Sequence, residues 1–315
     1  MKRIGLAGIV VVLAVGLMSC QQQGERLRFA TGGTTGTYYA FGTAIAQVLS
    51  ERLGISITVE STGASRANIQ FIDAGESELA LVQNDVADYA YRGVDMFQAE
   101  GKMTSFSAVA ALYPEVIQII ANPAAGIRSI SDLRGKRVSV GDSGSGTEFN
   151  AQQILNTHGI TFADIQRQNL GFGASADAFK DGRLDAFFVV AGPPTPAIVD
   201  LAITHNILLL GFEPAAIDRL MEQYPVYAPF TIAANSYSGQ ASPTETVSVK
   251  ATLIVSNSVS EDTVYSITKA LFEYREQIAQ GHARGNDLDP AYAVQGIPFP
   301  FHPGAERYFK EIGLK

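Results

Sequence analysis

The chain has 315 residues, a formal net charge of −8 at neutral pH and a single cysteine. This length suits two domains, each with a substantial core. An acidic balance without a basic run argues against a nucleic-acid partner, and one cysteine excludes an internal disulfide and a cysteine-based metal cluster.

The N-terminus is typical of an export signal. Lys2 and Arg3 precede an apolar run over 4–18, which ends in Leu-Met-Ser-Cys at Cys20. The run is short for a membrane span but fits the apolar region of a signal peptide. Its end resembles the lipobox of bacterial lipoproteins. The resemblance implies a cleaved lipoprotein signal peptide (1–19), a lipid on Cys20, and a periplasmic or cell-surface protein held at a bacterial membrane by lipid only. A plain signal peptide and an uncleaved anchor are the alternatives.

Beyond the signal, the sequence alternates strands with helices. Apolar runs predict strands at 27–30, 55–59, 79–83, 107–112, 116–121, 137–140, 186–190, 207–210 and 251–255. Apolar residues at helical spacing, such as Phe41, Ile45 and Val48, predict amphipathic helices between them. This alternation predicts an α/β fold with mostly parallel sheets and helices on both faces.

The chain is expected to cross between two lobes twice. An extended stretch over 108–121 leads from the first strand-loop-helix pattern to its repeat, which places the first crossover near Tyr113. A return near Lys250 brings the C-terminal helices back. The expected division is lobe 1 over 20–112 plus 251–315, and lobe 2 over 113–250.

Two stretches share one design, in which a short strand, a loop of Gly with Ser or Thr, and a helix follow one another. They read LRFATGGTTGTYYAFG from Leu27 and RVSVGDSGSGTEFN from Arg137. Free N–H groups and the helix dipole favour an anion at a helix N-terminus, so two such loops predict a cleft that closes on a small carboxylate. The candidate ligand-binding residues are Thr34, Thr35, Gly36, Thr37 and Tyr38 in the first loop, and Ser143, Gly144, Ser145, Gly146 and Thr147 in the second. The alternative for each loop is a tight turn with Ser or Thr as helix N-cap.

Further polar residues follow predicted strands, where open α/β sheets bind ligands. Ser61, Gln83, Asp85 and Thr195 are candidates of this kind. Asp85 can accept an ammonium group, which favours an amino acid over a simple dicarboxylate. The alternative is an aspartate that steadies the dipole of its helix. Arg66 either pairs with a ligand carboxylate or is a solvated helix arginine.

Several segments resemble one family in the same order along the chain. SDLRGKRVSVGDSGSGT (131–147), GRLDAFFVVAGPPTPAI (182–198) and PFPFHPGAERYFKEIG (298–313), together with the first loop, are similar to the TAXI solute receptors of TRAP transporters. The resemblance implies a two-lobed periplasmic binding protein fold of type II with a hinge. It also implies that a small acid such as glutamate, glutamine or 2-oxoglutarate is handed to a sodium-coupled permease. The alternative is the binding component of an ABC importer or a membrane sensor.

Catalytic motifs fail on order or spacing. GDSG at 141–144 copies the nucleophile signature of trypsin-like proteases, but every histidine follows Ser143, the first being His158. No Walker lysine follows Gly146, and the histidines show no metal-ligand spacing. The sequence therefore predicts a binding protein that is not an enzyme and has no cofactor or metal.

Overall fold

The computed structural model describes residues 26–315, so the predicted signal peptide and Cys20 lie outside the described part. The strands are β1 (Arg26–Ala30), β2 (Ser56–Glu60), β3 (Leu79–Gln83), β4 (Phe106–Ala121), β5 (Arg137–Ser139), β6 (Gln166–Gln168), β7 (Ala186–Ala191), β8 (Leu208–Leu209), β9 (Ala228–Ile232) and β10 (Thr244–Ser256). The α-helices are α1 (Thr37–Leu53), α2 (Ser65–Asp73), α3 (Asn84–Arg92), α4 (Gly146–Thr157), α5 (Phe172–Lys180), α6 (Pro196–Thr204), α7 (Pro214–Gln223), α8 (Glu261–Glu273), α9 (Arg275–Gly281), α10 (Pro290–Ala293) and α11 (Pro303–Glu311). No helix within 26–315 is long and apolar enough to cross a membrane.

One sheet runs through both lobes in the order β2-β1-β3-β10-β4-β7-β5-β6. β1 pairs parallel with β2 and β3, and β5 pairs parallel with β6 and β7. The long strands β4 and β10 are antiparallel to each other and to β7 and β3 respectively. The expected parallel strands thus form the outer part of each lobe, and the two long strands add an antiparallel centre.

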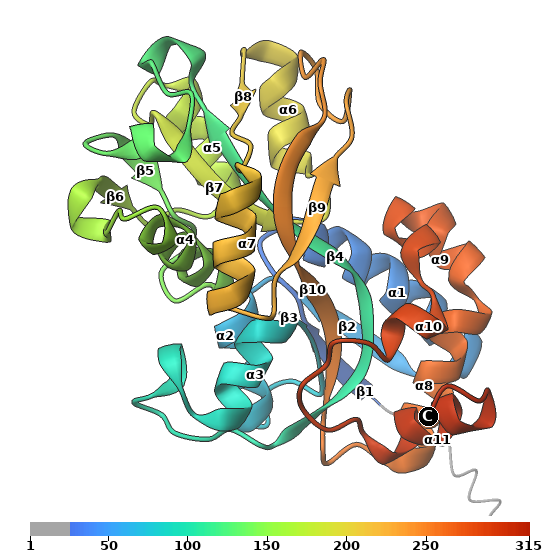
Figure 1. Cartoon of the computed structure of the whole chain (residues 1–315). Helices are drawn as coiled ribbons and strands as arrows, with labels where there is room; N and C mark the ends of the chain where they lie inside the picture. Colours follow the sequence, from blue (N-terminus) through green and yellow to red (C-terminus); the bar gives the residue numbers. More distant parts are fainter. Residues whose placement is uncertain (1–25) are drawn as a thin grey trace, which may run out of the picture.

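The strands β4 and β10 connect the lobes and lie side by side along their length (Figure 1). Tyr113 pairs with Ala251, and the register shifts between Ala251 and Thr252, which marks a β-bulge. The predicted crossovers near Tyr113 and Lys250 therefore fall opposite each other within these strands, although the division into 20–112 plus 251–315 and 113–250 stays a prediction.

Each lobe has helices and an apolar core on both faces of the sheet. In lobe 2, the neighbouring Phe187 and Phe188 of β7 are fully buried in different core clusters, because successive side chains of a strand point to opposite faces. In lobe 1, Leu253 and Ile254 of β10 divide between two clusters in the same way. Strands buried on both faces read as continuous apolar runs, which is why these runs predict their strands well.

The sequence pattern missed strands whose side chains are largely polar or exposed. β6 has the sequence QRQ with no buried side chain, and β9 lies at an edge of the sheet, paired with β10. The N-terminal half of β10, which pairs with β9, was also missed, because Thr, Ser and Glu alternate there with Val. Ile232 of β9 and Val247 and Val249 of β10 are buried in the core, but none of these segments has a continuous apolar run.

Candidate functional site

Four helices begin at one cavity between the lobes. It is lined by N-terminal residues of α1, α2, α4 and α5 and by side chains from β3, β4 and β7. The empty volume is about 380 Å³. We call this space the inner cavity. Six of the residues predicted from the sequence line it, namely Gly36, Thr37, Tyr38, Gln83, Gly146 and Thr147. The other lining residues, absent from the prediction, are Gly32, Gly33, Ala64, Ser65, Glu115, Phe172, Val190 and Ala191.

Three of these helices have no side chain that caps their first turn. The N-cap residues of α1, α2 and α5 are Gly36, Ala64 and Gly171, and none accepts a hydrogen bond through a side chain. In α4, by contrast, Oγ of Ser145 accepts from the N–H of Glu148 at 3.1 Å. The first N–H groups of an α-helix lack partners inside the helix, so the uncapped helices offer donors and positive dipole ends to an anion.

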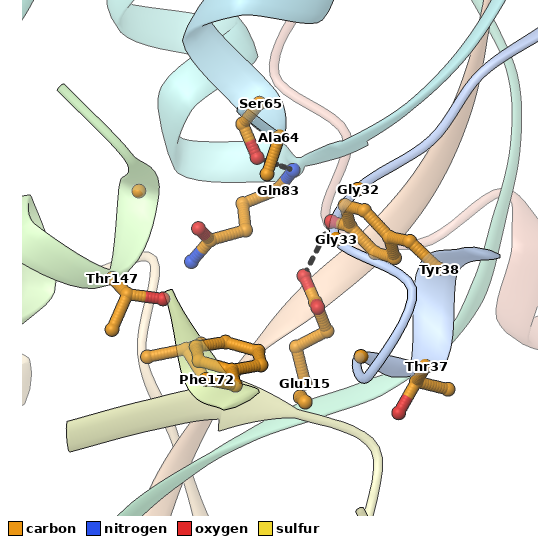
Figure 2. A pocket seen from close by; sticks show the side chains of 14 residues that line it. Gly32, Gly33, Thr37, Tyr38, Ala64, Ser65, Gln83, Glu115, Thr147 and Phe172 are labelled. Atoms are coloured by element: carbon orange, nitrogen blue, oxygen red, sulfur yellow. Dashed lines mark hydrogen bonds between the residues drawn. The ribbon is translucent and has the colours of Figure 1, made fainter. Parts of the chain in front are cut away.

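A buried carboxyl group faces the same cavity. Glu115 of β4 is 2% exposed, and its Oε2 accepts a hydrogen bond of 2.6 Å from the hydroxyl of Tyr38 (Figure 2). Burial raises the pKa of Glu115 well above its ordinary value; the Tyr38 hydroxyl opposes this, and the charge of Asp85 adds to it. The signal in the sequence was a lone acidic residue inside an otherwise apolar extended run, since an unpaired charge is rarely fully buried without a function.

An outer cavity adjoins the inner one and holds several other predicted residues. Thr34, Thr35, Ser61 and Ser145 line it. Four residues line both spaces, namely Gly33, Ala64, Thr147 and Phe172. In Figure 2 the ring of Phe172 lies between Thr147 and Glu115. Phe172 therefore lies at the boundary between the inner and the outer cavity.

Four predicted residues line neither space. Asp85 is fully buried and accepts a 2.8 Å hydrogen bond from Nδ2 of Asn150, because the first turn of α3 points its side chain at α4. Thr195 is also fully buried, and its Oγ1 accepts from Nε2 of Gln118 at 2.9 Å. Ser143 is exposed on its loop. Gly144 lines a separate hollow with Arg66, which forms an ion pair with Glu100.

The GDSG loop is not assembled into a catalytic site in the described residues. The Nδ1 atom of each histidine makes a hydrogen-bond contact with a group no more than four residues away in the chain. This holds for His158, His205, His282 and His302. None of these contacts involves Ser143. Within residues 26–315 there is also no group of three or more His, Cys, Asp or Glu side chains that could hold a metal ion.

Comparison with known proteins agrees with this architecture. The model of the NMT1-like family matches residues 29–313. The periplasmic aliphatic sulphonate binding protein SsuA from Escherichia coli is 17% identical over 91% of this chain and 83% of its own, with a TM-score of 0.52. PhnD1 from Prochlorococcus marinus, solved with methylphosphonate, is 9% identical over 92% of this chain and 99% of its own, with a TM-score of 0.58.

A binding protein component of a phosphonate ABC transporter from Pseudomonas aeruginosa has a TM-score of 0.52, with 13% identity over 83% of this chain and 79% of its own. Identities this low show the fold alone. The predicted two-lobed α/β fold of the periplasmic binding proteins is confirmed, and the chain belongs to the NMT1-like family.

Proposed function

We propose that this protein is an extracytoplasmic solute-binding protein that captures a small acid between its lobes and delivers it to a membrane importer. One observation carries the proposal: the uncapped N-termini of α1, α2 and α5 meet at a cavity between the lobes. Within 26–315, no Arg, Lys or His lines this cavity. Backbone N–H groups, together with the hydroxyls of Ser65 and Thr147, are therefore the proposed donors for the carboxylate of the ligand.

In this proposal Glu115 has the role that the sequence suggested for Asp85, which is to accept the ammonium group of the ligand. Its carboxyl lines the inner cavity, whereas Asp85 is bound to Asn150. A ligand ammonium group beside Glu115 would stabilise the ionised carboxyl that burial disfavours. This arrangement supports an amino acid such as glutamate or glutamine over 2-oxoglutarate, which has no amino group.

Isothermal titration of the full chain tests this ligand class. The probes are L-glutamate, L-glutamine, 2-oxoglutarate, methylphosphonate and methanesulfonate. We expect saturable binding of an amino acid, and a loss of at least about a hundredfold in Glu115→Gln, since removing one partner of a buried charge pair costs about 3–5 kcal/mol. The matched control is Glu51→Gln, an exposed position of α1, which should bind like the wild type. Binding of the phosphonate or sulfonate alone, unchanged in Glu115→Gln, would contradict the amino-acid assignment.

The transporter that receives the solute can be of two classes. The similar solved structure from Pseudomonas aeruginosa serves an ABC transporter, and this fold relationship favours an ABC importer. The motifs at 131–147 and 182–198 resemble TAXI receptors, which favours a sodium-coupled TRAP permease as the second candidate. Reconstitution of the protein with each candidate permease in proteoliposomes separates the two, since uptake driven by ATP supports the first and uptake driven by a sodium gradient the second.

The proposed location rests on the sequence over 1–20. A lipid on Cys20 would hold the protein at the outer side of a bacterial membrane. In a bacterial host, Cys20→Ser is expected to move the protein from the membrane fraction to the soluble fraction, whereas Ser19→Ala, which keeps a small residue before the cysteine, should leave it in the membrane fraction. Equal membrane retention of both variants would refute the lipid anchor.

A further inference from the structure

Six buried polar side chains join the two lobes beside the inner cavity. Each is no more than 5% exposed, and they are Gln83, Asp85 and Tyr89 from lobe 1 and Asn150, Gln153 and Tyr227 from lobe 2. We call them the interlobe network. Only Gln83 also lines the inner cavity.

Asn150 is the centre of the network. Its Oδ1 accepts from Nε2 of Gln83 at 2.6 Å, and its Nδ2 donates to Oδ2 of Asp85 and to the hydroxyl of Tyr227, each at 2.8 Å. Asn150 therefore holds two groups of lobe 1 and one of lobe 2 at once. Separation of the lobes breaks its bonds to Gln83 and Asp85.

A second chain of bonds extends the contact. The hydroxyl of Tyr227 donates to Oε1 of Gln153 at 2.6 Å, and Nε2 of Gln153 donates to the hydroxyl of Tyr89 at 3.1 Å. Buried polar groups are costly when they are left without partners. The network thus stabilises the closed arrangement through contacts that need no solute.

Asp85 is the member of the interlobe network whose hydrogen bonds are incomplete. Its Oδ1 is buried and has no hydrogen-bond partner among the described residues. The titratable groups that act on it are Asp88 and Tyr89 on its own helix, Tyr227 from lobe 2 and Glu115 on β4. None of them is basic.

These surroundings disfavour the ionised carboxyl. Burial raises the pKa of Asp85 to about 6, although Asn150 and the backbone N–H groups at the start of α3 oppose the shift. An aspartate that reaches water when the lobes part has an ordinary pKa of about 3.9. Protonation of Asp85 therefore favours the closed arrangement.

We propose that Asp85 and Asn150 form a proton-dependent latch between the lobes, which closes more readily when Asp85 carries a proton. The latch rests on the proposed function only in that solute capture uses lobe closure. It acts on the equilibrium between open and closed forms even in the absence of a solute, so it can be measured without knowing the ligand.

The expected size of the effect follows from linkage. A group whose pKa is raised on closure favours closure most when pH lies below its open-state pKa, and this advantage is lost as pH rises through the closed-state pKa. With closed and open values of about 6 and 3.9, the ratio of closed to open protein is about tenfold higher at pH 5 than at pH 8.

Spin labels on the two lobes measure this ratio. Cysteines at the exposed positions Ala74 and Ala215, in a Cys20→Ser background, carry the labels. Pulsed electron paramagnetic resonance of the ligand-free protein then gives the open and closed populations at pH 5 and pH 8. We expect about a tenfold change in the wild-type ratio and a flat profile in Asp85→Asn, which keeps an oxygen to accept from Asn150.

The control variant is Asp73→Asn at the end of α2. Asp73 is exposed and is not among the groups that act on Asp85, so its replacement should leave the pH response in place. A wild-type change of less than about twofold, or a response that persists in Asp85→Asn, would overturn the latch.

A second variant tests the network apart from titration. Tyr89→Phe removes the lobe 1 hydroxyl that accepts from Gln153 of lobe 2. The ratio of closed to open protein should fall about fivefold or more at both pH values, with the far-ultraviolet circular dichroism unchanged. A folded variant with the wild-type ratio would show that the network does not control closure.

Discussion

The hydroxyl of Tyr38 donates a 2.6 Å hydrogen bond to Oε2 of Glu115, which ties the first turn of α1 to the middle of β4. Both side chains are buried and both line the inner cavity. The bond joins a lobe 1 helix to one of the two strands that connect the lobes, so it fixes the carboxyl at the position where a solute would meet it.

Tyr38→Phe is expected to destabilise the protein. It removes the donor to a buried carboxyl, and an unsatisfied buried group costs about 1–3 kcal/mol in the free energy of unfolding. Urea unfolding measures the loss. The neighbouring Tyr39 is only partly buried, and Tyr39→Phe should change the free energy by less than about 0.5 kcal/mol. Equal effects of the two variants would contradict the role of the bond.

Glu115 should make stability depend on pH. Its pKa is raised in the folded protein by burial, so its contribution is fully present below the ordinary pKa of an unfolded glutamate and is lost as pH rises toward the folded value. We expect the melting temperature to fall from pH 5 to pH 8, and the fall to be smaller in Glu115→Gln. An identical fall in both proteins would assign the pH dependence to other groups.

Gly146 is expected to control closure. A Cβ atom at this position would lie 1.7 Å from Oε1 of Gln83, across the lobe boundary. Gly146→Val should therefore hold the lobes apart and weaken solute binding about tenfold or more, since overpacking costs about 1–3 kcal/mol. The melting temperature should change little, because parting of the lobes relieves the clash.

The matched control for this clash is Gly63→Ala. Within 4 Å, a Cβ atom on Gly63 meets only Cβ of Ala67, at 3.6 Å, and Gly63 lines neither cavity. Titration of the solute found for the wild type compares the variants. Loss of folding in Gly146→Val, or full binding by it, would show that the second loop does not have the role proposed for it.

Ser145 serves the helix as well as the outer cavity. Its Oγ caps α4, so Ser145→Ala should lower the free energy of unfolding by about 1 kcal/mol. Ser143, two residues earlier, is exposed, and Ser143→Ala should have no measurable effect on the same unfolding curve. A stable Ser145→Ala variant that still loses solute affinity would instead make Ser145 a ligand contact.

The sequence predicted the parts of the cavity lining that lie in regular strand-loop-helix units. Gly36 and Gly146 stand where a strand delivers a loop to a helix N-terminus, and this local order is visible in composition and spacing alone. The sequence also predicted Gln83 as a site residue, because it follows a buried strand, and Gln83 lines the inner cavity.

The remaining parts of the site depend on tertiary placement. Glu115 is hidden in an apolar extended run, and only the passage of β4 between the lobes brings it to the cavity. Asp85 is close to Gln83 in sequence, but the rotation of α3 turns its carboxyl toward Asn150 of the other lobe. Side-chain direction at a helix start is not encoded in the order of strands and helices, so the acidic side chain that lines the cavity is Glu115, which the sequence did not predict as a site residue, and not Asp85.

The position of β10 also constrains how the chain is made. β3 is complete at Gln83 and pairs with β1 on one side, but its neighbour on the other side is the segment Ala251–Val255. Until the ribosome has passed that segment, lobe 1 has an unpaired strand edge, a surface to which other chains can add. Much of lobe 2, including the pairing of β4 with β7, can form before then. Lobe 1 is therefore the first lobe to be started and the last to be completed. Export of the chain before folding would keep this exposed strand edge away from other newly made chains at the site of synthesis.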